Sequence, residues 1–193
     1  MTRVVLASRS PQRLALLTGL GLAVDVIESG INERTEGDPL EIVRENAIAK
    51  ALAVASRPDL SSAVVVAGDT EVIIDGKALG QPTDLGEAGQ MLRDLSGRKH
   101  SVAGGLCVVF PEEESPRVGV EETAVFFKDL PDGLLEAYVA GNEWRGRAGG
   151  YAIQGSGSSL VERVEGDISN VIGLPLGLLA RLAPELLRPT RQN

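Results

Sequence analysis

The chain has 193 residues, with 27 acidic and 19 basic side chains, a formal net charge of −8 and a sequence pI near 4.8. This acidic balance argues against binding to nucleic-acid polymers or anionic membranes, which depends on clustered Lys and Arg. One cysteine and one histidine exclude disulfide stapling, a zinc site of the usual ligands and a Cys–His nucleophilic pair. Because no apolar run reaches about twenty residues, we expect a soluble, cytoplasmic protein with one domain over residues 1–193.

The first expected elements are a short buried strand over residues 4–6 and the helix that follows it. Ser10 is a natural N-cap, a proline suits the first helical position, and a glycine ends the helix. Free backbone N–H groups at a helix start attract anions, and Ser8, Arg9 and Arg13 surround this one. The segment is therefore either a phosphate-binding site or an ordinary capped helix with solvated arginines.

A second helix is predicted from the N-cap Asp38 to about Arg57, where apolar side chains recur at helical spacing. Lys50 falls at the border of its apolar stripe. A lysine at that border either extends to solvent or directs its ammonium into a cleft.

Two strand segments are expected next, over residues 63–67 and 72–74, with a hairpin turn at residues 75–76. Gly68 and Asp69 lie between the segments. We therefore expect the Asp69 carboxylate where a buried strand emerges, beside a glycine that permits close approach of a ligand.

The rest of the chain alternates helix and strand signals, which predicts an α/β or α+β class. The glycine-rich stretch 144–157 is expected close to another backbone or a ligand, the alternative being a mobile surface loop. His100 is predicted to be a hydrogen-bonded structural residue. Helices are predicted over 83–95 and 131–139, strands over 102–110 and 118–127, and a last helix to about residue 187 that Pro184 kinks or splits, followed by a frayed tail.

The remaining polar side chains indicate oxygen chemistry on a phosphate. Carboxylates, hydroxyls and cations are the groups needed to hold Mg²⁺ on a polyphosphate and to activate water. No Gly-x-x-x-x-Gly-Lys-Ser/Thr loop occurs, which disfavours a P-loop enzyme that cuts the γ-phosphate. The candidates are Glu33 and Asp69, Ser8, Ser10 and Thr70, and Arg13 and Lys50.

Six motifs follow one another along nearly the whole chain: 6–13 (LASRSPQR), 67–70 (AGDT), 79–82 (LGQP), 91–97 (MLRDLSG), 148–155 (AGGYAIQG) and 170–176 (NVIGLPL). Together they resemble the Maf family of nucleoside triphosphate pyrophosphatases. The resemblance implies a two-lobed mixed α/β fold like that of the inosine-triphosphate pyrophosphatases, with a central mixed sheet and an interlobe cleft. It also implies metal-dependent hydrolysis of a nucleoside triphosphate to the monophosphate and pyrophosphate.

The same resemblance assigns roles by position. It implies that Asp69 is the general base and that Glu33 lies with it near the divalent metal, Mg²⁺ or Mn²⁺. The expected partner is a nucleoside triphosphate, and a homodimer is a further candidate. The implied phosphate-binding residues are Ser8, Arg13 and Lys50, to which the capped helix start adds Ser10.

Three positions separate the substrate branches of the family. The branch acting on dTTP and UTP typically has Arg, Thr and Gln where this chain has Gln12, Thr70 and Gln154. The branch acting on 7-methyl-GTP typically has Trp, Gln and Glu. The chain matches the first branch at two of three, which predicts pyrimidine selection by Thr70 and Gln154.

Gln12 and Gln81 stand where the family usually has basic residues. Each missing charge-assisted hydrogen bond costs on the order of 1.5–3 kcal/mol, so we expect compensation by Arg9 or Lys77, or an altered base preference. The alternatives are a pyrophosphatase of broad or 7-methyl-GTP specificity, and a non-catalytic nucleotide-binding regulator, since family members have been linked to septum formation.

Overall fold

The computed structural model describes residues 3–187, and the fold in that range is built on one seven-stranded mixed sheet. The strand order is β2-β1-β3-β5-β6-β7, with β4 paired to β3. β1 runs parallel to β2 and β3, and the other pairs are antiparallel. The strands are β1 (Val4–Leu6), β2 (Val24–Val26), β3 (Val64–Ile74), β4 (Lys77–Ala78), β5 (Lys99–Val109), β6 (Arg117–Phe127) and β7 (Val161–Glu165).

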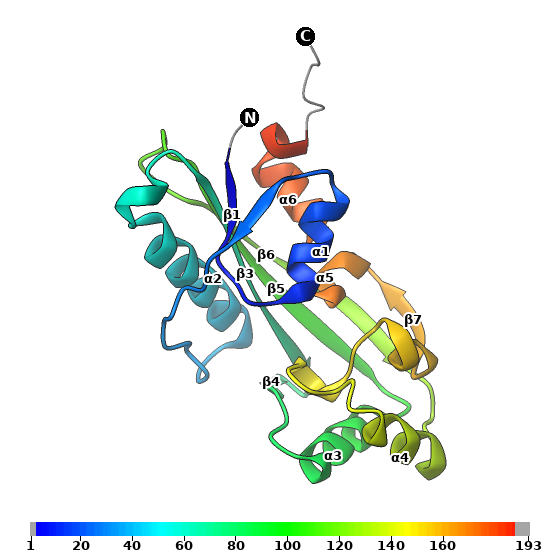
Figure 1. Cartoon of the computed structure of the whole chain (residues 1–193). Helices are drawn as coiled ribbons and strands as arrows, with labels where there is room; N and C mark the ends of the chain where they lie inside the picture. Colours follow the sequence, from blue (N-terminus) through cyan, green and yellow to red (C-terminus); the bar gives the residue numbers. More distant parts are fainter. Residues whose placement is uncertain (1–2, 188–193) are drawn as a thin grey trace.

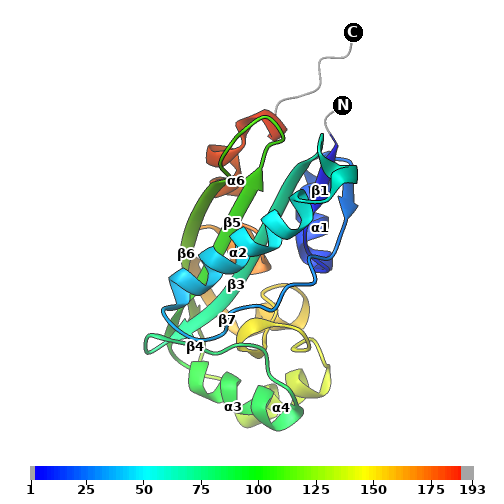
Figure 2. The same cartoon turned by 90° about the vertical axis from the view of Figure 1, so that its left-hand side faces the viewer.

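Helices cover both faces of this sheet, α2 on one side and α1, α5 and α6 on the other (Figures 1 and 2). No helix within residues 3–187 has the length and apolar character needed to cross a bilayer. The α-helices are α1 (Pro11–Gly19), α2 (Pro39–Ala55), α3 (Leu85–Leu95), α4 (Asp132–Ala140), α5 (Ile168–Ile172) and α6 (Leu176–Leu182). Short 3₁₀ turns are η1 (Pro58–Leu60), η2 (Ala148–Gly150), η3 (Gly155–Ser159) and η4 (Pro184–Leu187).

The alternation of side chains along β3 assigns its residues to these two layers. Val66 packs with Leu17 of α1, whereas its neighbour Val65 packs with Ala51 of α2. Farther along the strand, Val72 belongs to a third apolar cluster, which α3 and α4 cover at the other end of the sheet. The fold is therefore mixed α/β, as predicted. Its helices form two groups on one sheet, with α1, α2, α5 and α6 at one end and α3 and α4 at the other.

The structure corrects the prediction of two strands over residues 63–67 and 72–74. β3 is continuous because β5 pairs with it from Val65 to Ile73. Asp69 consequently lies inside a strand and not at its end. β2, β7 and α5 were not predicted from the sequence, whereas Pro184 does separate α6 from η4 as expected. The expected frayed tail lies outside the described residues.

Two glycines of β5 allow the helices to approach the sheet closely. Gly104 and Gly105 stand opposite residues 69–70 of β3. A Cβ at Gly105 would lie 2.0 Å from the carbonyl oxygen of Val43 in α2, and one at Gly104 would lie 1.8 Å from Oδ1 of Asn170 in α5. Only glycine therefore lets both helices come this near to the middle of β3.

Candidate functional site

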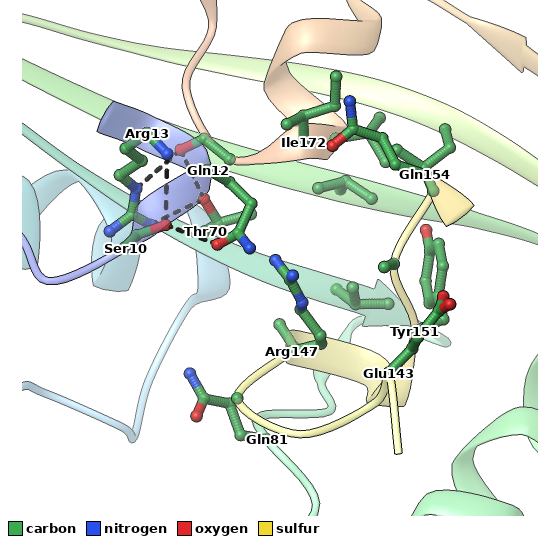
Figure 3. Close-up of a pocket in the computed structure, with 18 of the residues that line it drawn as sticks. Ser10, Gln12, Arg13, Thr70, Gln81, Glu143, Arg147, Tyr151, Gln154 and Ile172 are labelled. Atoms are coloured by element: carbon green, nitrogen blue, oxygen red, sulfur yellow. Dashed lines mark hydrogen bonds between the residues drawn. The ribbon is translucent and has the colours of Figure 1, made fainter. Parts of the chain in front are cut away.

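A cavity of about 360 Å³ lies between the α1 side of the sheet and the glycine-rich segment near α4 (Figure 3). Its volume is in the range of small-molecule sites. The start of α1, the middle of β3, the loop before α3 and the turn after α5 all contribute. Polar side chains in its wall are those of Ser10, Gln12, Arg13, Thr70, Gln81, Glu143, Arg147 and Gln154.

The start of α1 is a capped helix, as predicted. The hydroxyl of Ser10 accepts a hydrogen bond from the Arg13 amide at 3.4 Å and donates one to Oε1 of Gln12 at 3.1 Å. The hydroxyl of Ser8 accepts from the Ser10 amide at 3.1 Å. Ser8 therefore orders the turn before the helix, and Ser10 and Gln12 face the cavity.

Arg13 connects this turn to β3 and to the segment after α5. Its guanidinium donates to the Ser8 hydroxyl at 3.0 Å, to the Thr70 hydroxyl at 3.1 Å and to the Gly173 carbonyl at 2.8 Å. Burial lowers the pKa of Arg13, and the carboxylates of Asp69 and Glu33 oppose that shift. The site thus holds a desolvated cation with negative charge nearby.

Thr70 is more restrained than the predicted base-selecting role suggests. Its hydroxyl accepts from Arg13 and lies 3.3 Å from the Gly173 carbonyl, to which it donates. Gln154, the other predicted specificity residue, lines the same cavity but is exposed at its edge. Thr70 therefore positions Arg13, and Gln154 is the freer of the two to contact a ligand.

Asp69 faces the opposite side of the sheet, toward α2. The Lys50 ammonium donates to Oδ1 of Asp69 at 2.8 Å and lies 3.0 Å from Oε1 of Glu33. Lys50 is only 6% exposed, so its ammonium points inward to these two carboxylates and does not extend to solvent. The structure thus separates the predicted phosphate-binding residues: Ser8, Ser10 and Arg13 lie together, whereas Lys50 lies with Asp69 and Glu33.

Asn46 of α2 is a site residue that the sequence analysis missed. Its amide nitrogen donates to Oδ2 of Asp69 at 2.8 Å and to the Arg34 carbonyl at 2.9 Å, and its oxygen accepts from the Arg34 amide at 2.8 Å. Asn46 therefore connects Asp69 by hydrogen bonds to Arg34, the neighbour of Glu33 in the chain. Its position one turn before Lys50 on α2 was the available signal.

Carboxylates in this region are suitable donors for a hard divalent cation. Oε2 of Glu71, on the same face of β3 as Asp69, is buried and has no hydrogen-bond partner among residues 3–187. Burial and the charge of Asp69 raise the pKa of Glu71 to about 7. Within residues 3–187, no three or more His, Cys, Asp or Glu side chains form a metal-binding group. Glu33 and Asp69 fit the case in which Mg²⁺ takes one or two carboxylates and completes its shell with phosphate oxygens and water.

Among the described residues, the edge of β3 that faces β1 is paired with strands at its two ends only. β1 ends at Leu6 opposite Val66, and β4 begins to pair only at Ile73. No strand within residues 3–187 covers the β1-side edge of β3 between these points.

The two cations expected to compensate for the neutral Gln12 and Gln81, Arg9 and Lys77, lie outside the cavity wall. Arg9 is exposed and pairs with Glu28, 3.0 Å away, and Lys77 is exposed on β4; neither lines the cavity. The cavity does contain Arg147, from the glycine-rich segment.

The single histidine is a hydrogen-bonded structural residue, as predicted, and the single cysteine is buried. His100 is 3% exposed, and its Nε2 lies 2.8 Å from the Tyr151 hydroxyl. Cys107 is buried in the α2-facing cluster, where burial raises its pKa to about 12. A thiol with so high a pKa is not a nucleophile near neutral pH.

Comparison with known proteins identifies relatives over nearly the whole chain. The family model described as "Maf-like protein" matches residues 3–186. A dTTP/UTP pyrophosphatase of Deinococcus radiodurans is 44% identical over 182 residues, covering 93% of this chain and 91% of that protein. One of Dictyoglomus thermophilum is 39% identical over 191 residues, covering 95% and 98%. A HAM1 protein from Coxiella burnetii superimposes with a TM-score of 0.58 at 18% identity, covering 96% of this chain and 100% of that chain, which supports the fold alone.

Proposed function

Because the chain belongs to the Maf-like protein family, we propose that it hydrolyses dTTP and UTP to the monophosphate and pyrophosphate. The relatives described above carry the name dTTP/UTP pyrophosphatase. One observation carries the proposal further than the names do. Two adjacent residues of β3 face different sites: Asp69 faces Lys50 and Glu33, and Thr70 faces a cavity in the size range of small-molecule sites.

In this proposal the nucleotide occupies the cavity, and its phosphates extend past the unpaired edge of β3 toward Asp69. Arg13 binds phosphate oxygens, and the positive end of the α1 helix dipole favours them. Asp69 takes the proton of the attacking water, and Lys50 and Asn46 hold its carboxylate in place. A Mg²⁺ or Mn²⁺ ion held by Glu33 and Asp69 would supply Lewis-acid stabilisation of charge on the phosphate.

Gln154 supports the pyrimidine preference. A carboxamide both donates and accepts, which matches the O4 and N3–H edge of uracil or thymine. Replacing Gln154 with Glu removes the donor and adds charge. We expect kcat/KM for dTTP and UTP to fall by about tenfold or more, with little change in thermal stability, because Gln154 is exposed.

The deciding experiment separates the products of each nucleoside triphosphate by anion-exchange chromatography, with Mg²⁺ or Mn²⁺ at fixed ionic strength. We expect monophosphate and pyrophosphate as first products, fastest from dTTP and UTP. Diphosphate and orthophosphate as first products would contradict cleavage at the α-phosphate. Binding of nucleotides without any turnover would favour the regulator.

The neutral side chain of Gln12 in the cavity favours a second candidate, a pyrophosphatase of broader specificity. Restoring a cation with Gln12→Arg should then sharpen the preference for dTTP and UTP. Faster hydrolysis of 7-methyl-GTP or ITP than of dTTP and UTP, under matched conditions, would instead establish the alternative substrate class.

A further inference from the structure

Arg147 is a cation of the cavity whose charge is opposed, among residues 3–187, by Glu143 at longer range and not by a direct ion pair. The charged side chains in the wall are those of Arg13, Glu143 and Arg147. All three guanidinium nitrogens of Arg13 donate within the protein, and the Glu143 carboxylate accepts from the amides of Ser156 and Gly157. Across residues 3–187 the Arg147 guanidinium makes no hydrogen bond or ion pair, although it is partly buried.

The backbone around Arg147 is held firmly, so its side chain starts from a defined place. The Arg147 amide donates to the Trp144 carbonyl at 3.1 Å, and its carbonyl accepts from Gly150 at 3.1 Å. The next residue but one, Gly149, donates to the Gly80 carbonyl at 2.7 Å and has φ near +67°. A Cβ at Gly149 would lie 2.8 Å from Cγ1 of Val72, so this turn packs directly on β3.

The guanidinium points toward one particular end of the cavity. In Figure 3 it extends toward Gln12 and Thr70, and away from Tyr151 and Gln154. The end it faces also contains Arg13 and the start of α1, where the positive end of the helix dipole favours anions. The end it leaves holds the aromatic ring and the carboxamide, which suit a base.

We propose that Arg147 binds the polyphosphate of the substrate and supplies a cation that the neutral Gln12 and Gln81 do not. This inference rests on the proposed function and deepens it, since it names a phosphate-binding residue that neither the motifs nor the relatives assign. A guanidinium donates two parallel hydrogen bonds to phosphate oxygens, and one that makes no direct hydrogen bond or ion pair to a carboxylate has its N–H donors available for them. A neutral pyrimidine base carries no negative charge for the guanidinium to pair with.

The test compares three full-length variants by titration calorimetry at constant Mg²⁺. Arg147→Gln removes the charge, and Arg147→Lys keeps it. Arg145→Gln is the matched control, because Arg145 lies in the same turn but stacks on Trp144, with 4.6 Å from its guanidinium carbon to the ring centroid, and donates to Asn142. The probes are inorganic pyrophosphate, α,β-imido-UTP and UMP.

We expect Arg147→Gln to weaken binding of pyrophosphate and α,β-imido-UTP by about 10- to 100-fold, and that of UMP by less than about threefold. Arg147→Lys should recover part of the loss, and Arg145→Gln should match the unaltered protein. An equal loss for UMP and the triphosphate analogue, or no loss for any probe, would overturn the proposal. Unaltered protein that binds pyrophosphate through Arg147 but does not hydrolyse dTTP or UTP would overturn the proposed function alone.

Discussion

Both oxygens of Asp69 accept a hydrogen bond, one from Lys50 and one from Asn46. In an Asp69→Asn variant the amide nitrogen must face one of these donors, so one hydrogen bond is lost together with the charge. We expect the chain to fold with about 1–3 kcal/mol less free energy of unfolding, and kcat to fall by about 10²–10⁴-fold. Pyrophosphate release and urea unfolding measure the two effects.

Asp25→Asn is the control for this variant, because it also removes a carboxylate but alters only the exposed pair with Arg3. It should leave kcat unchanged and alter stability by less than about 1 kcal/mol. Near-normal turnover of Asp69→Asn would show that Asp69 is not the base.

His100 makes the free energy of unfolding depend on pH. Burial lowers its pKa from 6.5 to about 4, so between these pH values the unfolded chain binds a proton that the folded chain does not. The contribution of neutral His100 is therefore complete above pH 6.5 and falls by about 3 kcal/mol as the pH drops to 4. Urea unfolding at pH 7 and pH 4.5 should show a smaller loss for His100→Gln than for the unaltered chain. Identical losses in the two proteins would contradict this.

At the scale of elements, the contact between α2 and β5 determines where Lys50 and Asn46 lie. Gly105→Ala would place a methyl group 2.0 Å from the Val43 carbonyl, so α2 must move away from the sheet. We expect a loss of about 3 kcal/mol in unfolding free energy and a fall in kcat, because both side chains move with the helix. Gly133→Ala in α4, where a Cβ meets nothing within 4 Å, is the matched control and should not destabilise. Equal stabilities for the two variants would contradict the close contact.

The elements that local sequence could predict are those with strong local signals. α1, α2 and α3 each have an N-cap, at Ser10, Asp38 and Asp84, before an apolar repeat. β2 and β7 lack such signals, because they are short outer strands whose side chains are mostly polar or exposed.

The site was predictable to the extent that its residue types carry the chemistry. Asp69, Lys50 and Arg13 stand out in sequence, and the structure gives each of them a polar partner. Their placement on two opposite faces of the sheet was not predictable from local sequence. It follows from β3 being one continuous strand, and β3 is continuous because it pairs with β5 along its length. Asn46 was missed for the same reason: helical spacing gives the face of α2 but not the strand residue that it meets.

At the scale of the whole molecule, β3 joins the two helix groups. Val66 belongs to the apolar cluster near α1, and Val72 and Ile74 belong to the cluster near α3 and α4. Both helix groups pack on the same strand, so unfolding of either group would expose the apolar side chains of the other. We therefore expect one cooperative unfolding transition, as a single domain over residues 1–193 requires. Calorimetric and van't Hoff enthalpies should agree. Two separable transitions would show two domains.

A ligand in the cavity should stabilise that entire unit, because the cavity wall takes residues from both groups of elements. At 100 times its Kd, α,β-imido-UTP should raise the unfolding free energy by about 2.7 kcal/mol, which raises Tm by roughly 5–10 °C for a chain of this size. A Tm that does not change with saturating analogue, when calorimetry shows binding, would place the ligand elsewhere.

The side-chain alternation of β3 also bears on how such a protein diverges. Thr70, Gln12, Gln154 and Arg147 are reached from the cavity, whereas the Lys50–Asp69–Asn46 hydrogen bonds lie behind the strand. Substitutions in the cavity can therefore alter which nucleotide fits while the carboxylate keeps its partners. Insertion of one residue into β3 has the opposite effect, because it exchanges the two faces and removes recognition and chemistry in a single step. New substrates are thus accessible to this fold through point substitutions, and length changes in β3 are not tolerated.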